Sequence, residues 1–196
     1  MVRIVTLIIA VAAQVLSTNS VWADAATSPK IEMQTTVNEI VRIAAIYPDE
    51  SQKAERRAKL RAVINPKFNF SEMAKRSLGA NWNDISIEEQ QDFTTVFSEL
   101  LARTYLSKIE TVKPGMVKVE SESVELSRAS VKTSVISKGD SFPIEYRLSF
   151  QDGRWQVYDV VIENIGLVAN YRNEFSGIIR KSKFSGLMEK LRAKVG

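Results

Sequence analysis

The chain of 196 residues contains neither cysteine nor histidine. The lack of cysteine excludes disulfides, thiol nucleophiles and cysteine-based zinc sites. The lack of histidine excludes haem held by imidazole and every serine triad in which imidazole is the base. Any catalysis would therefore depend on carboxylate, lysine or tyrosine chemistry. We expect a protein that is not an enzyme and that holds no metal or other cofactor.

Glycine and proline are also scarce, at 8 and 5 residues, and the composition of 44% apolar and 26% charged residues is typical of one globular domain. The formal net charge is +4. Lysine and arginine are mixed with acidic residues along the chain and do not form a basic stripe, so the charge does not indicate a nucleic-acid partner.

The N-terminus has the pattern of a secretory signal peptide. Arg3 precedes the apolar run 4–13, and Val21-Trp22-Ala23 fits the site of a signal peptidase. The run is much shorter than the roughly 20 residues that cross a bilayer. We therefore expect a signal peptide at 1–23 and a single domain at 24–196. An exported chain without cysteine is typical of the bacterial periplasm.

Apolar residues recur at helical spacing in the first half of the chain and again after Gly166. The longest of these helices opens with a capping box, Ser86 with Glu89, in which each side chain bonds a free backbone N–H group. The pattern predicts helices over 29–47, 49–63, 68–78, 86–109 and in two stretches after residue 166.

Between these helices the apolar period changes to two, which predicts strands. Gly139-Asp140 and Asp152-Gly153 are turn signals on either side of the clearest strand. Helices followed by an antiparallel meander of about four strands indicate an α+β fold. The apolar face of the sheet needs a cover, and we expect the aromatic stripe of 93–109 to supply it. The strands are predicted over 116–126, 129–137, 142–150 and 154–162.

One acidic residue has two possible roles. Strict alternation places Asp159 on the same face as Trp155 and Val157. A carboxylate among apolar neighbours could act as a general base, with Tyr105 or Tyr146 as its partner. It could equally be held by a backbone or arginine partner, and the sequence alone leaves both roles open.

Short motifs in order along residues 30–195 resemble the MlaC family, the toluene-tolerance auxiliary proteins of ABC transporters. One departure is Asn164-Ile165-Gly166, where the family usually shows glycine, an aliphatic residue and serine. The motifs are Phe70-Ser71-Glu72-Met73-Ala74, Leu78-Gly79, Trp82, Glu89-Gln90, Phe93, Phe97, Leu100-Leu101, Tyr105, Tyr146-Arg147-Leu148, Gly153-Arg154-Trp155, Val157-Tyr158-Asp159-Val160, Leu167-Val168, Asn170-Tyr171-Arg172, Phe175, Gly186-Leu187 and Leu191.

The resemblance implies an NTF2-like or cystatin-like fold with an apolar cavity between sheet and helices. It also implies a soluble periplasmic phospholipid carrier that serves an inner-membrane ABC transporter complex and an outer-membrane lipoprotein–porin complex, and so maintains outer-membrane lipid asymmetry. Three alternatives stay open. They are a binding protein for hopanoids or another apolar ligand, from a sister branch; an NTF2-like isomerase or hydrolase that uses Asp159 and a tyrosine; and an interaction adaptor with a filled core.

For the carrier, the predicted cavity lining comes from one helix, the sheet and the returning helix. Arg147 and Arg172 are candidates for the headgroup, because a guanidinium group can form paired hydrogen bonds with a phosphate. Either arginine could instead pair with Glu145 or Glu163. The predicted lining residues are Phe93, Phe97, Leu101, Tyr105, Ile144, Tyr146, Leu148, Val160, Leu167 and Tyr171.

Overall fold

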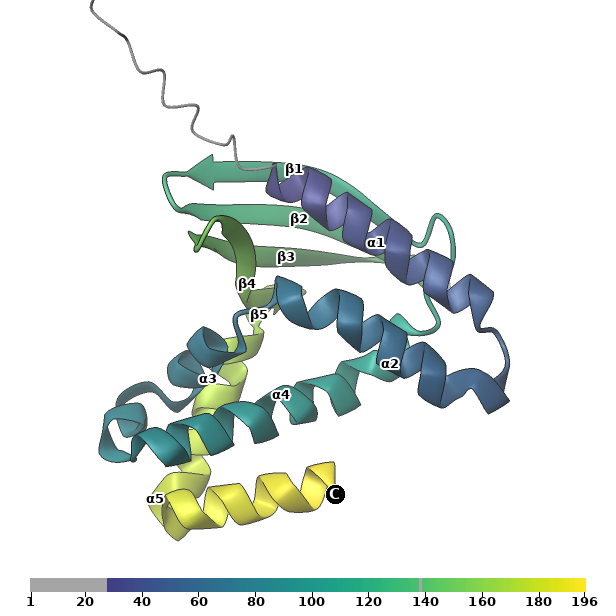
Figure 1. Cartoon of the computed structure of the whole chain (residues 1–196). Coiled ribbons are helices and arrows are strands. Elements are labelled where there is room, and N and C mark those ends of the chain that lie inside the picture. The colour runs from purple at the N-terminus through teal and green to yellow at the C-terminus, as the bar shows by residue number, and fades with distance from the viewer. Residues whose placement is uncertain (1–27, 138) are drawn as a thin grey trace, which may run out of the picture.

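The computed structural model describes residues 28–137 and 139–196 (Figure 1). The predicted signal peptide lies outside the described residues. The structure has an α+β fold, in which helices come first, a meander follows and a long helix ends the chain, as the sequence predicts.

Five α-helices form where apolar residues recur at helical spacing. Ser28 caps the first, and Ser86 with Glu89 forms the predicted capping box of the fourth. The last helix contains a non-helical residue, Lys183, beyond which its second part turns back beneath α4 (Figure 1). The helices are α1 (Pro29–Ile46), α2 (Lys53–Ile64), α3 (Phe70–Leu78), α4 (Ile87–Ile109) and α5 (Leu167–Val195), with 3-10 turns at Glu50–Gln52, Asn65–Lys67 and Gly79–Asp84.

The strands pair in sequence order as an antiparallel sheet, so the predicted meander is confirmed. A short fifth strand extends the four that the sequence predicts and leads directly into α5. The strands are β1 (Val117–Glu125), β2 (Arg128–Ser137), β3 (Asp140–Gln151), β4 (Arg154–Ile162) and β5 (Ile165–Gly166).

A β-bulge in β4 changes which residues share a face. Leu148 is opposite Val157, whereas its neighbour Arg147 is opposite Asp159, so Tyr158 is the extra residue. The bulge shifts the alternation by one position. Asp159 therefore lies on the opposite face from Val157, and the prediction that they share a face was wrong.

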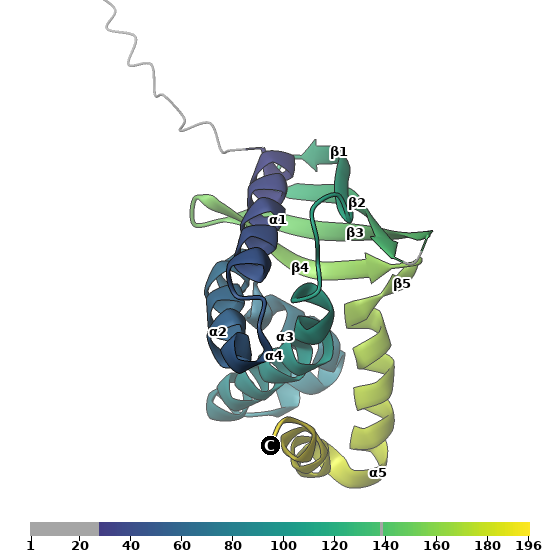
Figure 2. The same ribbon diagram turned by 90° about the vertical axis from the view of Figure 1, so that its right-hand side faces the viewer.

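Figure 2 shows how the helices are distributed around the sheet. α1 lies along the apolar face over β1 and β2, while α5 descends from β5 on the other side of the molecule. The prediction that the stripe of α4 covers the sheet was wrong, because this stripe packs against α3 and α5. An α1–α2 hairpin provides the actual cover and thereby frees α4 for a second core.

Buried apolar residues form three groups. The helical cluster contains Met73, Ala74, Leu78, Phe93, Val96, Phe97, Leu100, Leu101, Val168, Tyr171, Phe175, Leu187, Met188 and Leu191. The sheet cluster contains Val119, Ala129, Val131, Leu148, Trp155, Val157 and Val160. The hairpin cluster contains Ile43, Leu60 and Leu106.

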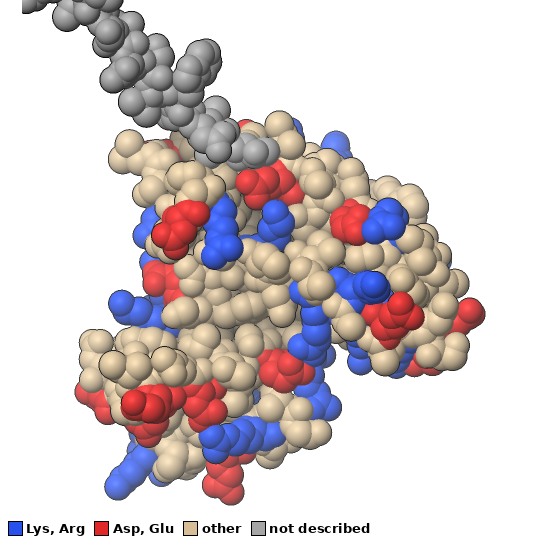
Figure 3. All heavy atoms as spheres, in the orientation of Figure 1, with Lys and Arg blue, Asp and Glu red and all other residues tan. Residues whose placement is uncertain are grey.

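The surface is mixed in charge, as the sequence indicates. In Figure 3 acidic and basic side chains are interspersed over the visible face and do not form a single basic stripe.

Candidate functional site

The helical cluster and the sheet cluster meet along a boundary that we call the seam. Phe68 and Leu167 are partly buried and pack against both clusters. Leu167 is the first residue of α5, directly after β5, so it lies where the chain passes from the sheet to the helices. The ten predicted lining residues divide between the two sides of this seam.

On the helical side the aromatic rings pack against one another. Phe93 and Phe97 are stacked with ring centroids 5.7 Å apart, and both make edge-on contacts with Phe175. Tyr171 meets Phe97 edge-on at 5.2 Å. Such arrangements add to the stability gained from burial. Five predicted residues therefore belong to a filled helical core, in which only Tyr105 is not fully buried; these are Phe93, Phe97, Leu101, Tyr105 and Tyr171.

On the sheet side the predicted residues share one face of β3 and β4. Tyr146 is opposite Val160, and Leu148 lies two positions along the same strand. Ile144 and Tyr146 are only half-buried, although they belong to the apolar face of the sheet. This face is thus less completely covered than the helical core.

Three tyrosines contribute hydroxyl groups on the two sides of the seam. Burial raises the pKa of the Tyr105 and Tyr146 phenols above the ordinary value of 10. Burial also raises the pKa of Tyr171, and the nearby Tyr105 adds to this shift. All three phenols are therefore neutral at physiological pH, which suits an uncharged, apolar ligand.

Asp159 has a structural role at the start of α5. Its Oδ1 atom accepts hydrogen bonds from the backbone N–H groups of Val160, at 2.9 Å, and Val168, at 3.1 Å. Its Oδ2 atom lies 3.5 Å from Nη1 of Arg147. Because Val168 is in the first turn of α5, the carboxylate satisfies a free N–H group and a favourable helix dipole. It lies on the opposite face from Tyr146, so the structure does not bring this predicted catalytic pair together.

Both headgroup candidates are engaged elsewhere. Arg147 lies on the outer face of the sheet, where it also pairs with Glu145 at 3.3 Å. Arg172 is exposed, and its Nε donates to the carbonyl of Arg76 at 2.7 Å, at the end of α3. Neither guanidinium group belongs to the apolar seam.

Two hollows flank α1. One, of about 450 Å³, lies at its N-terminus beside the ends of two hairpins. The other, of about 250 Å³, lies between α1 and the loop that joins α4 to β1. None of the ten predicted residues lines either hollow. In this structure Phe68 and Leu167 contact the clusters on both sides of the seam.

Several residues of the sheet side escaped the sequence-based prediction. Met33 and Val37 of α1 pack on the sheet cluster, because α1 is the helix that covers the sheet. Their helical spacing was visible in the sequence, but not the surface that they meet. Trp155 and Val157 join the same face as Val160 only because of the bulge, which alternation could not indicate.

In the part of the chain that the structure describes, no three acidic side chains are grouped as a metal site would require. None of the described helices is both long enough and apolar enough to cross a bilayer.

The fold and the two-sided apolar seam define an α+β protein of one recognised family. The model of the MlaC protein family matches residues 34–193. The chain therefore belongs to the MlaC family.

Relatives agree with this assignment. The intermembrane phospholipid transport system binding protein MlaC of Haemophilus influenzae is 22% identical over 179 residues, which cover 86% of this chain and 83% of the relative. The structure of a phospholipid-binding protein from Ralstonia solanacearum in complex with a phospholipid has the same fold. Its TM-score is 0.74 and its identity 24%, over 85% of this chain and 96% of the other.

Proposed function

We propose that the protein is a periplasmic phospholipid carrier that holds acyl chains at the seam between the sheet cluster and the helical cluster. The observation that carries the proposal is membership of the MlaC family together with a fold shared with a protein seen in complex with a phospholipid. The relative from Haemophilus influenzae is named for phospholipid transport between membranes. The carrier role matches the neutral, apolar side chains on both sides of the seam.

The two clusters suit different parts of this task. The helical cluster is a filled core that keeps its shape, whereas Ile144 and Tyr146 on the sheet side remain half-buried. Acyl chains would enter by parting the contacts that Phe68 and Leu167 make with both clusters. The ligand would then supply the apolar surface that completes the cover of the sheet.

The energetics favour a carrier that releases its ligand only to a partner. Two acyl chains contain about 30 methylenes, and burial of each contributes about 0.8 kcal/mol. The gross sum exceeds the limit of roughly 18–21 kcal/mol seen for non-covalent affinities, so ordering costs must offset part of it. Spontaneous release into water would still be very slow. We therefore propose exchange with an inner-membrane ABC transporter complex and an outer-membrane lipoprotein–porin complex, in support of outer-membrane lipid asymmetry.

Lipid content of the purified protein tests the proposal. The protein is isolated from a bacterial periplasm without detergent, and extracted lipid is quantified by mass spectrometry. We expect about one phospholipid per chain. A lipid-free protein would contradict the proposal, and a hopanoid in place of phospholipid would identify the alternative ligand class.

A substitution at the seam makes this test specific. Leu167→Trp adds an indole where the two clusters meet, so we expect it to lower the phospholipid content by at least about tenfold, which corresponds to 1.4 kcal/mol. Ile165→Trp is the matched control, because Ile165 lies two residues earlier and is 64% exposed. Circular dichroism and the unfolding midpoint establish that both variants fold. Equal lipid content in the two variants would remove the seam from the proposal.

A further inference from the structure

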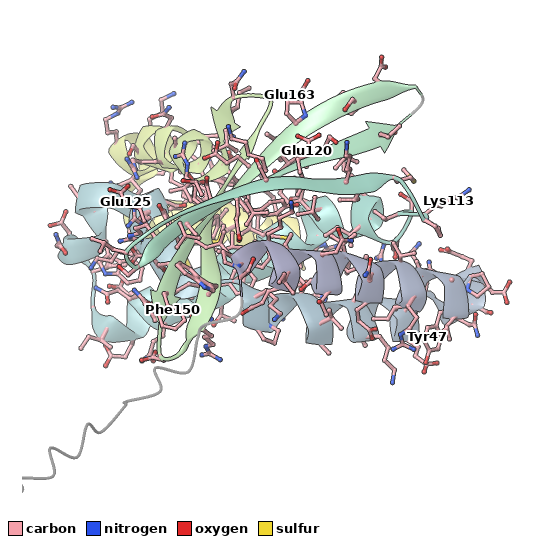
Figure 4. The ribbon with its side chains drawn as sticks, turned by 90° about the horizontal axis from the view of Figure 1, so that it is seen from above. Tyr47, Lys113, Glu120, Glu125, Phe150 and Glu163 are labelled. Atoms are coloured by element: carbon pink, nitrogen blue, oxygen red, sulfur yellow. The ribbon has the colours of Figure 1, made fainter. Side chains whose placement is uncertain are left out.

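The first strand of the sheet has an unpaired edge. β1 pairs only with β2, and among the described residues no other strand lies against its outer side. Its residues 120–125 are all exposed. Figure 4 looks down on this edge, which runs across the sheet and carries Glu120 and Glu125. Unpaired N–H and C=O groups along an edge are a template for an additional strand.

An apolar hollow lies at the end of this edge. It has a volume of about 450 Å³ and lies between the N-terminus of α1 and the turns of two hairpins. Figure 4 shows Glu125 of β1 and Phe150 of β3 at the same end of the sheet. The hollow is lined by Ser28, Pro29, Glu122, Val124, Leu126, Phe150 and Trp155.

Leu126 holds an apolar side chain in water at the tip of the β1–β2 hairpin. It is 95% exposed, and its φ of +52° is in the left-handed region that leucine rarely adopts. Val124 beside it is 51% exposed. Exposed apolar side chains gathered at the rim of a hollow indicate a surface that another molecule covers.

Trp155 provides a donor inside this hollow. The residue is only 6% exposed, and its indole Nε1–H group has no hydrogen-bond partner within the described residues. A buried N–H group without an acceptor is unfavourable, so a ligand that brings an acceptor gains from it. The main-chain carbonyl of an extended peptide is such an acceptor.

The charge of the edge indicates which kind of strand fits. Residues 120–125 contain three glutamates and no basic residue, although the chain as a whole has a net charge of +4. A second copy of β1 in antiparallel register would bring glutamates close to glutamates, which is unfavourable. A strand with basic side chains would be complementary to this edge.

We propose that β1 and the adjoining hollow form a docking site for an extended, basic segment of a protein partner. The segment pairs with the outer edge of β1 as an additional strand and places an apolar side chain against Val124 and Leu126. It provides a carbonyl acceptor for Trp155. The site is separate from the seam, and the proposal therefore does not depend on whether the protein carries lipid.

Peptide titration followed by NMR tests the proposal. The probe is an extended hexapeptide of alternating lysine and valine, added to the ¹⁵N-labelled protein. We expect shifts of the β1 amides and of the Trp155 indole N–H. A peptide with the same side chains but with alternate amides N-methylated should bind at least about tenfold more weakly, because it cannot complete the backbone ladder. A glutamate–valine hexapeptide should also bind more weakly.

Two variants locate the contact. Leu126→Asp should abolish the shifts, whereas Ile87→Asp should leave them unchanged, since Ile87 is 68% exposed at the start of α4. Trp155→Phe keeps an aromatic ring but removes the donor, and should weaken binding several-fold. The proposal is overturned if the N-methylated peptide binds equally well, if Leu126→Asp binds like Ile87→Asp, or if millimolar peptide causes no shifts in β1. It is likewise overturned if the edge proves to be occupied by a second copy of the chain or by lipid vesicles.

Discussion

The helical cluster and the sheet cluster are both apolar, but they are completed in different ways. Phe93, Phe97 and Phe175 have no exposed surface and contact one another. On the sheet, Ile144 and Tyr146 remain half-buried, and α1 covers only the part of the face over β1 and β2. The helices therefore form a core that needs no ligand. The sheet presents an apolar face that gains from one, which is the asymmetry expected of a carrier.

Truncation of one side chain in each cluster gives the largest expected contrast. Phe97→Ala removes a fully buried ring and should lower the free energy of unfolding by about 3–5 kcal/mol. Ile144→Ala removes a half-buried side chain and should cost only about 1–2 kcal/mol. Urea unfolding of lipid-free protein measures both values. Equal losses would show that the sheet side is packed as completely as the helical side.

Asp159 joins the two regions, since it extends from β4 to the first turn of α5. Asp159→Ala leaves the N–H groups of Val160 and Val168 without their acceptor, so we expect a loss of about 2 kcal/mol. Asp159→Asn keeps an acceptor oxygen and should cost less. Unfolding curves of the two variants separate the hydrogen bonds from the charge. If alanine were no worse than asparagine, the cap would contribute nothing.

Glu110 makes stability depend on pH on the helical side. Its side chain is 8% exposed and forms two hydrogen bonds with Arg57, at 2.8 and 2.9 Å. Hydrogen bonding to Arg57 lowers the pKa of this carboxyl, and the charges of the neighbouring basic groups add to the effect. The stabilisation is therefore complete above the ordinary pKa of about 4.3 and is lost as the pH falls through the lower pKa of the folded state.

The pH dependence of unfolding tests this contribution. Between pH 7 and pH 3 the original protein should lose more stability than Glu110→Gln, which has no proton to gain. The same loss in both proteins would show that other carboxylates account for acid unfolding.

Local patterns were sufficient for most of the fold, but not for the partners of each surface. The capping box at Ser86 and the alternation around Tyr146 correctly predicted a helix and a strand. The bulge at Tyr158 could not be predicted, because one extra residue changes no composition or period. The cover of the sheet was assigned to α4 because its aromatic stripe was the most prominent, yet α1 covers the sheet. Periodicity shows that a face is apolar without showing what packs on it.

The central claim is that the sheet region moves away from the helical region to admit acyl chains. The chain has no cysteine, so spin labels can be placed only where cysteines are introduced. Lys132→Cys on β2 and Thr95→Cys on α4, both exposed positions, report the separation of the two regions. Thr95→Cys with Lys190→Cys, which is also exposed, is a control pair within the helices. Pulsed electron paramagnetic resonance should show that phospholipid loading increases the first distance and leaves the second unchanged. Loading that changes neither distance would contradict the account.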